Sequence, residues 1–341
     1  MNDWKIFTGD LTPHDQIERL PEPPPWRVFG DEHLVAKERN ASDKAELAEL
    51  AHRGSTFQTD DYDPKDKEVK NQDRDHVIEM VNAALYLRRP LLITGKPGTG
   101  KSTLIYAVAH ELQLGAVLEW PITSRSSLQQ GLYSYDAIGR LQEQQRENRE
   151  MRIEDFLQLG PLGTALLPTR RPRALLIDEI DKSDLDLPND LLNIFEQGQF
   201  RIPELERLKS EEPVLIREHS GKESFPIVNG QVRCHQFPFV VMTSNGEREF
   251  PAPFLRRCLQ LRMKEPSVKL LKKIITAHLG SRIAEEADTL IADFVKRRSA
   301  DALATDQLLN TIHLVKGTHG VEEKDQDMLV NTLLKALTSD N

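Results

Sequence analysis

Cysteines and long apolar runs are scarce in this sequence, and each shortage excludes a class of protein. The 341 residues include two cysteines, Cys234 and Cys258, which are too few for a disulfide framework or a cysteine-based zinc site. No apolar run reaches the roughly 18 residues that a membrane-spanning helix needs. Residues 1–5 lack the basic and then apolar plan of a signal peptide. We therefore expect a cytoplasmic protein without a membrane span.

Basic and aromatic residues are also in short supply. Lysine and arginine number 45 against 54 aspartates and glutamates, a net charge of −9, and aromatic residues make up 6% of the chain. A nucleic-acid-binding surface needs an excess of lysine and arginine, with aromatic side chains where bases stack. The composition therefore argues against a nucleic-acid partner. The length favours about two domains.

The N-terminal segment differs from the rest of the chain. Residues 1–75 hold 18 acidic and 11 basic side chains, a net charge of −7. Residues 30–75 have few large apolar side chains, which is typical of a weakly ordered or extended segment, and three consecutive prolines at 23–25 favour polyproline II. We assign residues 1–70 to this segment and leave two interpretations open, a stiff linker and a docking strap. The apolar anchors of a strap would be Trp4, Phe7, Trp26 and Phe29.

Apolar strands alternate with helical stretches after residue 75. Because helical periodicity over 77–85 and 102–113 separates such strands, the pattern predicts a parallel sheet covered on both faces. After Pro266 only helical periodicity remains. We therefore expect an α/β domain over 71–265 and a small all-helical domain over 266–341. The five expected strands are 91–94, 116–120, 174–177, 239–243 and 259–263.

A glycine-rich loop follows the first expected strand and precedes a helix. It fits the phosphate-loop pattern G-x-x-x-x-G-K-[ST], whose backbone N–H groups face a phosphate while the helix start adds partial positive charge. Lys101 would reach the β- and γ-phosphates, and the Ser102 hydroxyl would bind Mg²⁺. We expect the nucleotide to contact Gly95, Lys96, Pro97, Gly98, Thr99, Gly100, Lys101, Ser102 and Thr103.

Polar residues end two other strands. Asp178 and Glu179 follow an apolar strand, and since ligands bind at the carboxyl edge of open α/β sheets, Asp178 suits a magnesium ligand and Glu179 suits a base that orients the attacking water. Asn245 ends the next strand, where it could hydrogen-bond both water and γ-phosphate. These residues complete a candidate nucleotide-hydrolysing site.

Two adjacent arginines precede the last expected strand. A guanidinium near the γ-phosphate stabilises the charge that spreads in phosphoryl transfer, and when a neighbouring subunit supplies it, activity depends on assembly. Arg256 and Arg257 are both candidates for this arginine finger. We favour Arg257 because it directly precedes the residue that starts the strand.

In this order, the motifs resemble those of an AAA+ ATPase, with Walker A, Walker B, sensor 1 and arginine finger, over about residues 70–341. Within that class the chain is most similar to the MoxR group. The resemblance implies ATP and Mg²⁺ as cofactors, a ring that is often hexameric, and remodelling of client proteins beside a partner with a von Willebrand factor A domain. It also implies two β-hairpin inserts, for which 124–170 and 200–237 have room. Asn229 and Gly230 fit a hairpin turn.

One departure from the family keeps other functions open. The sensor 2 arginine of many relatives falls here on Asp306, and a carboxylate cannot donate to phosphate. We expect an ATP-hydrolysing ring that remodels or activates partner proteins. The alternative is a nucleotide-dependent switch or sensor of a bacterial conflict system, since related sequences also occur there. A nucleic-acid-dependent or restriction-type GTPase ranks third.

Two further segments have open interpretations. Tyr133 and Tyr135 could line a central pore and grip a client chain, or they could pack the insert. The basic cluster over 169–173 is typical of a solvated loop, and the other interpretation is a contact with an acidic partner.

Overall fold

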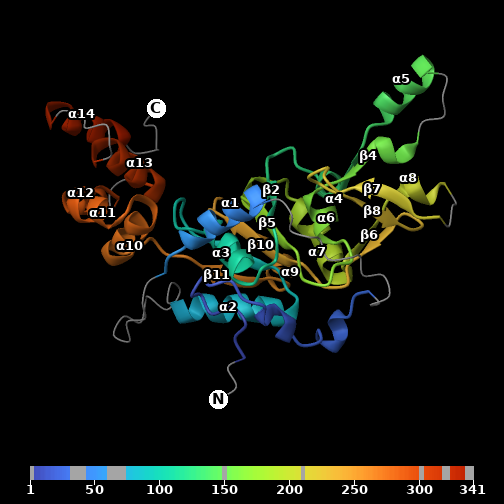
Figure 1. Ribbon diagram of the computed structural model, residues 1–341, viewed down its shortest axis with the longest axis horizontal. Helices are drawn as coiled ribbons and strands as arrows, with labels where there is room; N and C mark the ends of the chain where they lie inside the picture. Colours follow the sequence, from blue (N-terminus) through green and yellow to red (C-terminus); the bar gives the residue numbers. More distant parts are fainter. Residues whose placement is uncertain are drawn as a thin grey trace.

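A five-stranded parallel sheet lies at the centre of the computed structural model (Figure 1), which describes residues 4–30, 44–59, 74–147, 152–208, 212–298, 303–316 and 323–334. All its strand pairs are parallel, which confirms the fold class expected from the alternating pattern. The strands are, in spatial order, β11 (Leu259–Arg262), β1 (Leu91–Thr94), β10 (Phe239–Ser244), β5 (Ala174–Asp178) and β2 (Leu118–Pro121).

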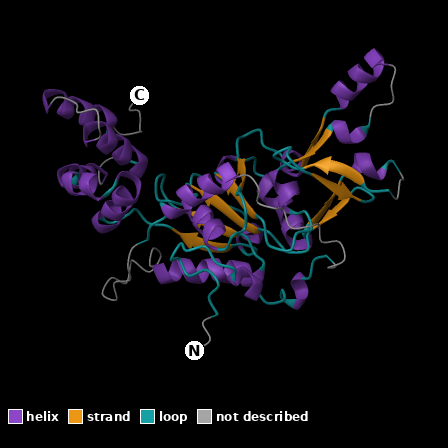
Figure 2. Ribbon diagram, viewed as in Figure 1, coloured by secondary structure: helices purple, strands orange, loops and turns teal. Residues whose placement is uncertain are grey.

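Helices cover both faces of this sheet (Figure 2), and the buried side chains form a separate cluster on each face. Successive residues of a strand point to opposite faces, so Leu92 joins one cluster while Leu91 and Ile93 join the other. The face of Leu91 packs against α2 (Arg74–Leu87) and α3 (Thr103–Glu111), with α1 (Lys44–Ser55) lying on α3. The opposite face packs against α6 (Pro161–Ala165), α7 (Leu187–Gln197), α4 (Leu128–Leu132) and α9 (Ala252–Leu255).

The two inserts form one shared sheet beside the core. Its order is β3-β4-β7-β8, and β4 pairs in parallel with β7, so the inserts are not two independent hairpins. Asn229 and Gly230 do form a turn, with φ of 51° and 65°, next to an antiparallel bridge between Val228 and Gln231. The helix α5 projects away from the body (Figure 1). The insert elements are β3 (Tyr133–Tyr135), α5 (Ala137–Glu147), η5 (Ile153–Asp155), β4 (Leu157–Leu159), β6 (Gln199–Arg201), α8 (Pro203–Glu206), β7 (Val214–Arg217), β8 (Ser224–Ile227) and β9 (Gln231–Arg233).

The C-terminal helices form a small domain with its own apolar core, set apart from the sheet (Figure 1). Ser267 caps the first of them by accepting the N–H of Leu270 at 3.1 Å. Ile275, Ile291 and Ile312 are among the side chains buried between them. The helices are α10 (Val268–Leu279), α11 (Ser281–Glu286), α12 (Asp288–Arg298), α13 (Thr305–Lys316) and α14 (Glu323–Leu333). No helix in the described ranges is long and apolar enough to cross a membrane.

Residues 4–30 lie along α2 and α3. Ile6 and Phe7 are buried, and their backbone N–H groups both donate to Asn82 Oδ1, at 2.6 and 3.0 Å. Of the four expected anchors, Phe7 and Phe29 are buried, Trp4 is 44% exposed and Trp26 is 75% exposed. Phe7 and Phe29 therefore pack into this chain's own core, and the two tryptophans remain largely outside it. The short helices η1 (Gln16–Arg19) and η2 (Pro25–Arg27) lie in this stretch.

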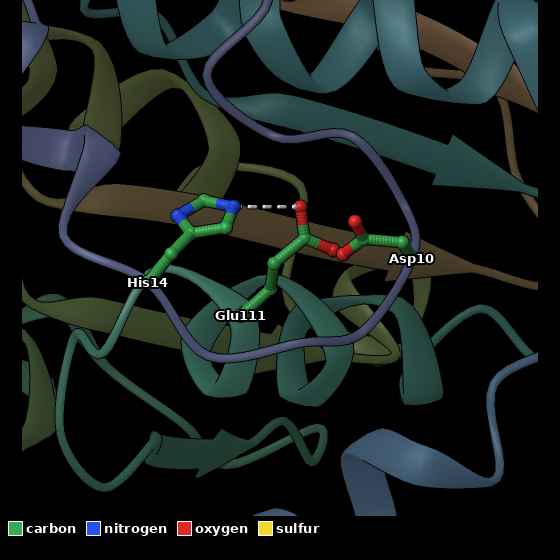
Figure 3. Close-up of side chains that lie close together, drawn as sticks. All are labelled: Asp10, His14 and Glu111. Atoms are coloured by element: carbon green, nitrogen blue, oxygen red, sulfur yellow. Dashed lines mark ion pairs between the residues drawn. The ribbon is translucent and has the colours of Figure 1, made fainter.

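A buried carboxylate fixes the same stretch to the end of α3 (Figure 3). Glu111 has no exposed surface, and its Oε1 accepts the N–H of Thr8 at 2.6 Å and that of Gly9 at 3.2 Å, while its Oε2 accepts the N–H of Leu11 at 3.0 Å. His14 Nε2 lies 3.3 Å from Oε1. Because N–H donors already occupy both oxygens, the carboxylate serves as an anchor for the chain.

The structure also bears on three other points about packing. Residues 30–75 do not lack regular structure, because α1 lies within them; residues 31–43 and 60–73 are outside the described residues. The basic cluster is not a free loop, since Arg171 Nε donates to Glu18 Oε1 at 2.8 Å and Arg170 pairs with the same carboxylate. Tyr133 is buried and donates to Glu204 Oε2 at 2.9 Å, so it packs the insert.

Candidate nucleotide site

The glycine-rich loop connects β1 to α3 as the sequence predicts. Gly98 and Gly100 have φ of 75° and 83°, a region that side chains disfavour. A Cβ on Gly98 would come within 2.4 Å of the backbone N of Thr305 at the start of α13. The loop therefore needs glycine here because the C-terminal domain approaches it closely.

Lys101 is buried at the base of this loop. Its ammonium donates to the carbonyl oxygens of Gly95 at 2.7 Å and Lys96 at 2.9 Å, and to Asn245 Oδ1 at 2.8 Å. Burial lowers the pKa of Lys101, and the carboxylates of Asp178, Asp181 and Glu179 act in the opposite direction. A buried cation held by neutral carbonyls is placed to receive an anion.

Asp178 binds the hydroxyl that follows Lys101. Ser102 Oγ donates to Asp178 Oδ1 at 2.8 Å, and Thr243 Oγ1 donates to the same oxygen at 2.5 Å. Thr243 in turn accepts the N–H of Glu179 at 2.9 Å. This buried threonine on β10 therefore fixes both acidic residues at the carboxyl edge of the sheet.

Glu179 has a left-handed backbone, with φ of 59°, at the point where β5 ends. Its Oε1 accepts from Asn245 Nδ2 at 3.3 Å, and its Oε2 accepts from Lys182 Nζ at 2.6 Å. The hydrogen bond with Glu179 raises the pKa of Lys182. Strained φ values at non-glycine residues concentrate at functional sites, and this one turns the carboxylate towards Asn245.

Asp181 holds the loop that carries Asn245. Asp181 is buried, and its Oδ2 accepts the N–H groups of Asn245 at 2.9 Å and Glu247 at 3.2 Å. Arg248 adds a hydrogen bond to the carbonyl of Ser183 at 2.7 Å. The turn after β10 is thus tied to the turn after β5.

A cavity of about 230 Å³ lies beside the phosphate loop. Residues 56–59, which follow α1, form one wall, and Ile274 and Leu309 of the C-terminal domain form another. Asp306, the residue at the expected sensor 2 position, also lines it. The cavity has the mostly apolar lining and few polar groups that are typical of ligand sites.

The two arginines lie outside this network. Arg257 pairs with Glu196 on α7 and donates to the carbonyl of Pro253 at 3.2 Å. Arg256 is exposed, and in the parts of the chain that are described its guanidinium has no hydrogen-bond partner, although its carbonyl accepts from Arg89 at 3.1 Å. No hydrogen bond among the described residues joins either arginine to the phosphate loop.

The structure brings together the residues expected from the phosphate loop and from the ends of β5 and β10. Sequence reasoning missed the supporting residues Thr243, Asp181 and Lys182, although each lies within four residues of an expected one. It also missed residues 56–59, because nothing in that short polar stretch indicates a cavity wall.

Comparison with known proteins agrees with this geometry. A family model described as the AAA domain of the dynein-related subfamily matches residues 90–258. Residues 90–258 have the AAA+ fold. This range runs from β1 to the residue before β11 and contains the whole hydrogen-bonded network. AAA domains generally bind ATP with Mg²⁺, and proteins that contain them commonly form oligomers.

Similarity to solved structures is weaker. The crystal structure of domain III from the Thermotoga maritima replication initiation protein DnaA is similar at 14% identity. The match covers 83% of this chain and 97% of that chain, with a TM-score of 0.39. No curated protein matches the chain.

Proposed function

We propose that the AAA domain hydrolyses ATP with Mg²⁺ at the phosphate loop. The observation that carries this proposal is the continuous set of hydrogen bonds from Lys101 through Asn245 to Glu179. These hydrogen bonds join a cation that can bind phosphate, an amide that can orient water and a carboxylate that can accept a proton. The cavity beside the loop has room for the adenine base of ATP, between residues 56–59 and the C-terminal domain.

The donor set fits Mg²⁺. Ser102 and Asp178 present hydroxyl and carboxylate oxygens 2.8 Å apart, and Mg²⁺ prefers oxygen ligands near phosphates. When bound, the ion neutralises negative charge on the phosphates. Thr243 holds Asp178 in place from the other side.

Each of three side chains has a separate role in hydrolysis. Lys101 leaves its carbonyl partners to bind the β- and γ-phosphates. Asn245 orients the attacking water and the γ-phosphate with its amide. Glu179 orients the same water and accepts its proton, while Thr243 and Asp181 hold the turns after β5 and β10 in place.

A neighbouring subunit supplies the arginine finger in this proposal. Arg256 fits this role better than Arg257 does, because its guanidinium is exposed while Glu196 already holds that of Arg257. The assembly is a ring, which the family resemblance makes a hexamer. Remodelling of a client protein beside a von Willebrand factor A partner is the role that the MoxR resemblance supports.

Glu179→Gln tests the assignment. The variant should bind ATP as tightly as the wild type in equilibrium dialysis. Its turnover number should be at least about 100-fold lower, because a general base typically contributes at least that factor to the rate. Glu285→Gln on α11 is the matched control and should turn over normally. Full activity in Glu179→Gln would remove Glu179 from the mechanism.

A nucleotide-dependent switch is the second candidate. Two observations favour it: Asp306 takes the place of a phosphate-binding arginine beside the loop, and hydrogen bonds occupy both oxygens of Glu179. A switch would hydrolyse ATP slowly until a trigger or partner stimulates it. Fast turnover by the isolated chain would exclude this candidate.

A further inference from the structure

Lys182 binds the carboxylate that we assign as the base, and the inference drawn from this contact rests on the proposed function. Its Nζ lies 2.6 Å from Glu179 Oε2, one turn along η6 (Ile180–Lys182). Asn245 occupies the other oxygen. We propose that Lys182 is a positioning residue that restrains Glu179 and keeps turnover low in a subunit that is not engaged by its neighbours.

The two restraints on Glu179 differ in what releases them. Asn245 is bonded to Lys101 through Oδ1 and to Glu179 through Nδ2. A γ-phosphate that draws Lys101 away therefore frees the amide, so nucleotide binding loosens the Asn245 contact. The Lys182 ammonium is held by Glu179 itself and not through Lys101, so ATP alone leaves this second restraint in place.

Other carboxylates lie close enough to Lys182 to accept it when it leaves Glu179. Asp181 and Glu247 are the other acids whose charges act on it. The Oδ2 of Asp181 is engaged by the backbone N–H groups of Asn245 and Glu247. The exposed side chain of Glu247, two residues after Asn245, is therefore the acceptor within this chain, and an acidic side chain of an adjoining subunit is the acceptor outside it.

The expected effect is modest because the pair is partly solvated. The side chains of Lys182 and Glu179 are 44% and 39% exposed, and exposed ion pairs are weak. We therefore expect loss of Lys182 to raise the basal rate about 2- to 5-fold.

The first test is steady-state ATP hydrolysis by the full chain. Lys182→Met should raise basal kcat about 2- to 5-fold with an unchanged KM for ATP, and Lys182→Arg, which keeps the pair, should stay near the wild-type rate. Lys222→Met is the matched control, since Lys222 pairs with Glu46 at 2.9 Å far along the chain. An unchanged or lower kcat in a folded Lys182→Met protein overturns the proposal.

The second test needs no turnover. Acetic anhydride acylates the neutral amine, so competitive labelling read by mass spectrometry reports how strongly Glu179 holds Lys182 in its charged form. Glu179→Gln should increase labelling of Lys182 several-fold and leave Lys222 unchanged. If Lys182 labels equally in both proteins, the restraint does not exist. A labelling change together with a wild type that hydrolyses no ATP refutes the proposed function instead.

Discussion

Loss of the Glu111 carboxylate should detach the N-terminal stretch from the core. Glu111 is fully buried at the end of α3 and receives the backbone N–H groups of Thr8, Gly9 and Leu11, together with the Thr8 hydroxyl at 2.9 Å. In Glu111→Gln one oxygen becomes an NH₂ group. That group faces the N–H of Leu11, so an acceptor is replaced by a second donor.

The size of the effect follows from these contacts. A hydrogen bond to a charged group contributes about 1.5–3 kcal/mol, and a neutral one about half of that. Glu111→Gln loses one charged bond and weakens the three others, so we expect docking of residues 4–30 to lose at least about 3 kcal/mol. That free energy corresponds to a roughly 100-fold faster amide exchange if the segment opens locally.

Hydrogen exchange read by mass spectrometry measures this directly. Peptides covering residues 4–30 should lose protection in Glu111→Gln, while peptides from β5 and β10 keep theirs. Glu49→Gln is the control: Glu49 pairs with Arg53 at 3.6 Å on the exposed side of α1, a contact worth about 0.3–0.5 kcal/mol. Unchanged protection of residues 4–30 in Glu111→Gln would refute the anchoring role.

Three further changes have defined outcomes. Asp181→Ala should lower kcat about 10- to 100-fold without changing ATP affinity in a binding titration, because Asp181 no longer holds the turn that positions Asn245. Gly163→Ala should lower the unfolding free energy by about 2 kcal/mol or more in urea titrations, since its Cβ would lie 1.9 Å from the carbonyl of Leu132. Burial and the nearby His52 lower the pKa of His278. As the pH falls, His278 is therefore protonated in the unfolded chain before it is protonated in the folded chain. The free energy of unfolding should decrease as the pH drops below about 6.5, and it should decrease less in His278→Gln.

The parts of the fold that the sequence predicted are those with local signals. The strands β1, β5 and β10 are short apolar runs, each followed by a glycine or polar cluster. A strand, a glycine-rich loop and a helix in succession specify one backbone path. The ends of neighbouring parallel strands meet at one edge, so the sequence alone is enough to place Asp178 and Asn245 together.

The remaining features depend on contacts between distant residues. In the sequence, nothing distinguishes Glu111 from other polar residues of α3. Only the folded structure shows that it binds backbone groups 100 or more positions away in the N-terminal stretch. Trp26 looks like an anchor by composition, yet Phe29 takes the buried position, stacked 5.2 Å from Phe237. Lys182 could not be assigned because an exposed lysine after an acidic pair has no distinguishing pattern.

The most direct test of an ATPase completed by its neighbour is the hydrolysis rate per protomer against protein concentration. The experiment is repeated with wild-type chains diluted by increasing fractions of Arg256→Ala or Arg257→Ala chains. We expect a cooperative rise with concentration, and a steeper loss than the fraction of Arg256→Ala chains alone explains. A rate per protomer that is independent of concentration and strictly proportional to the wild-type fraction would contradict a site shared between subunits.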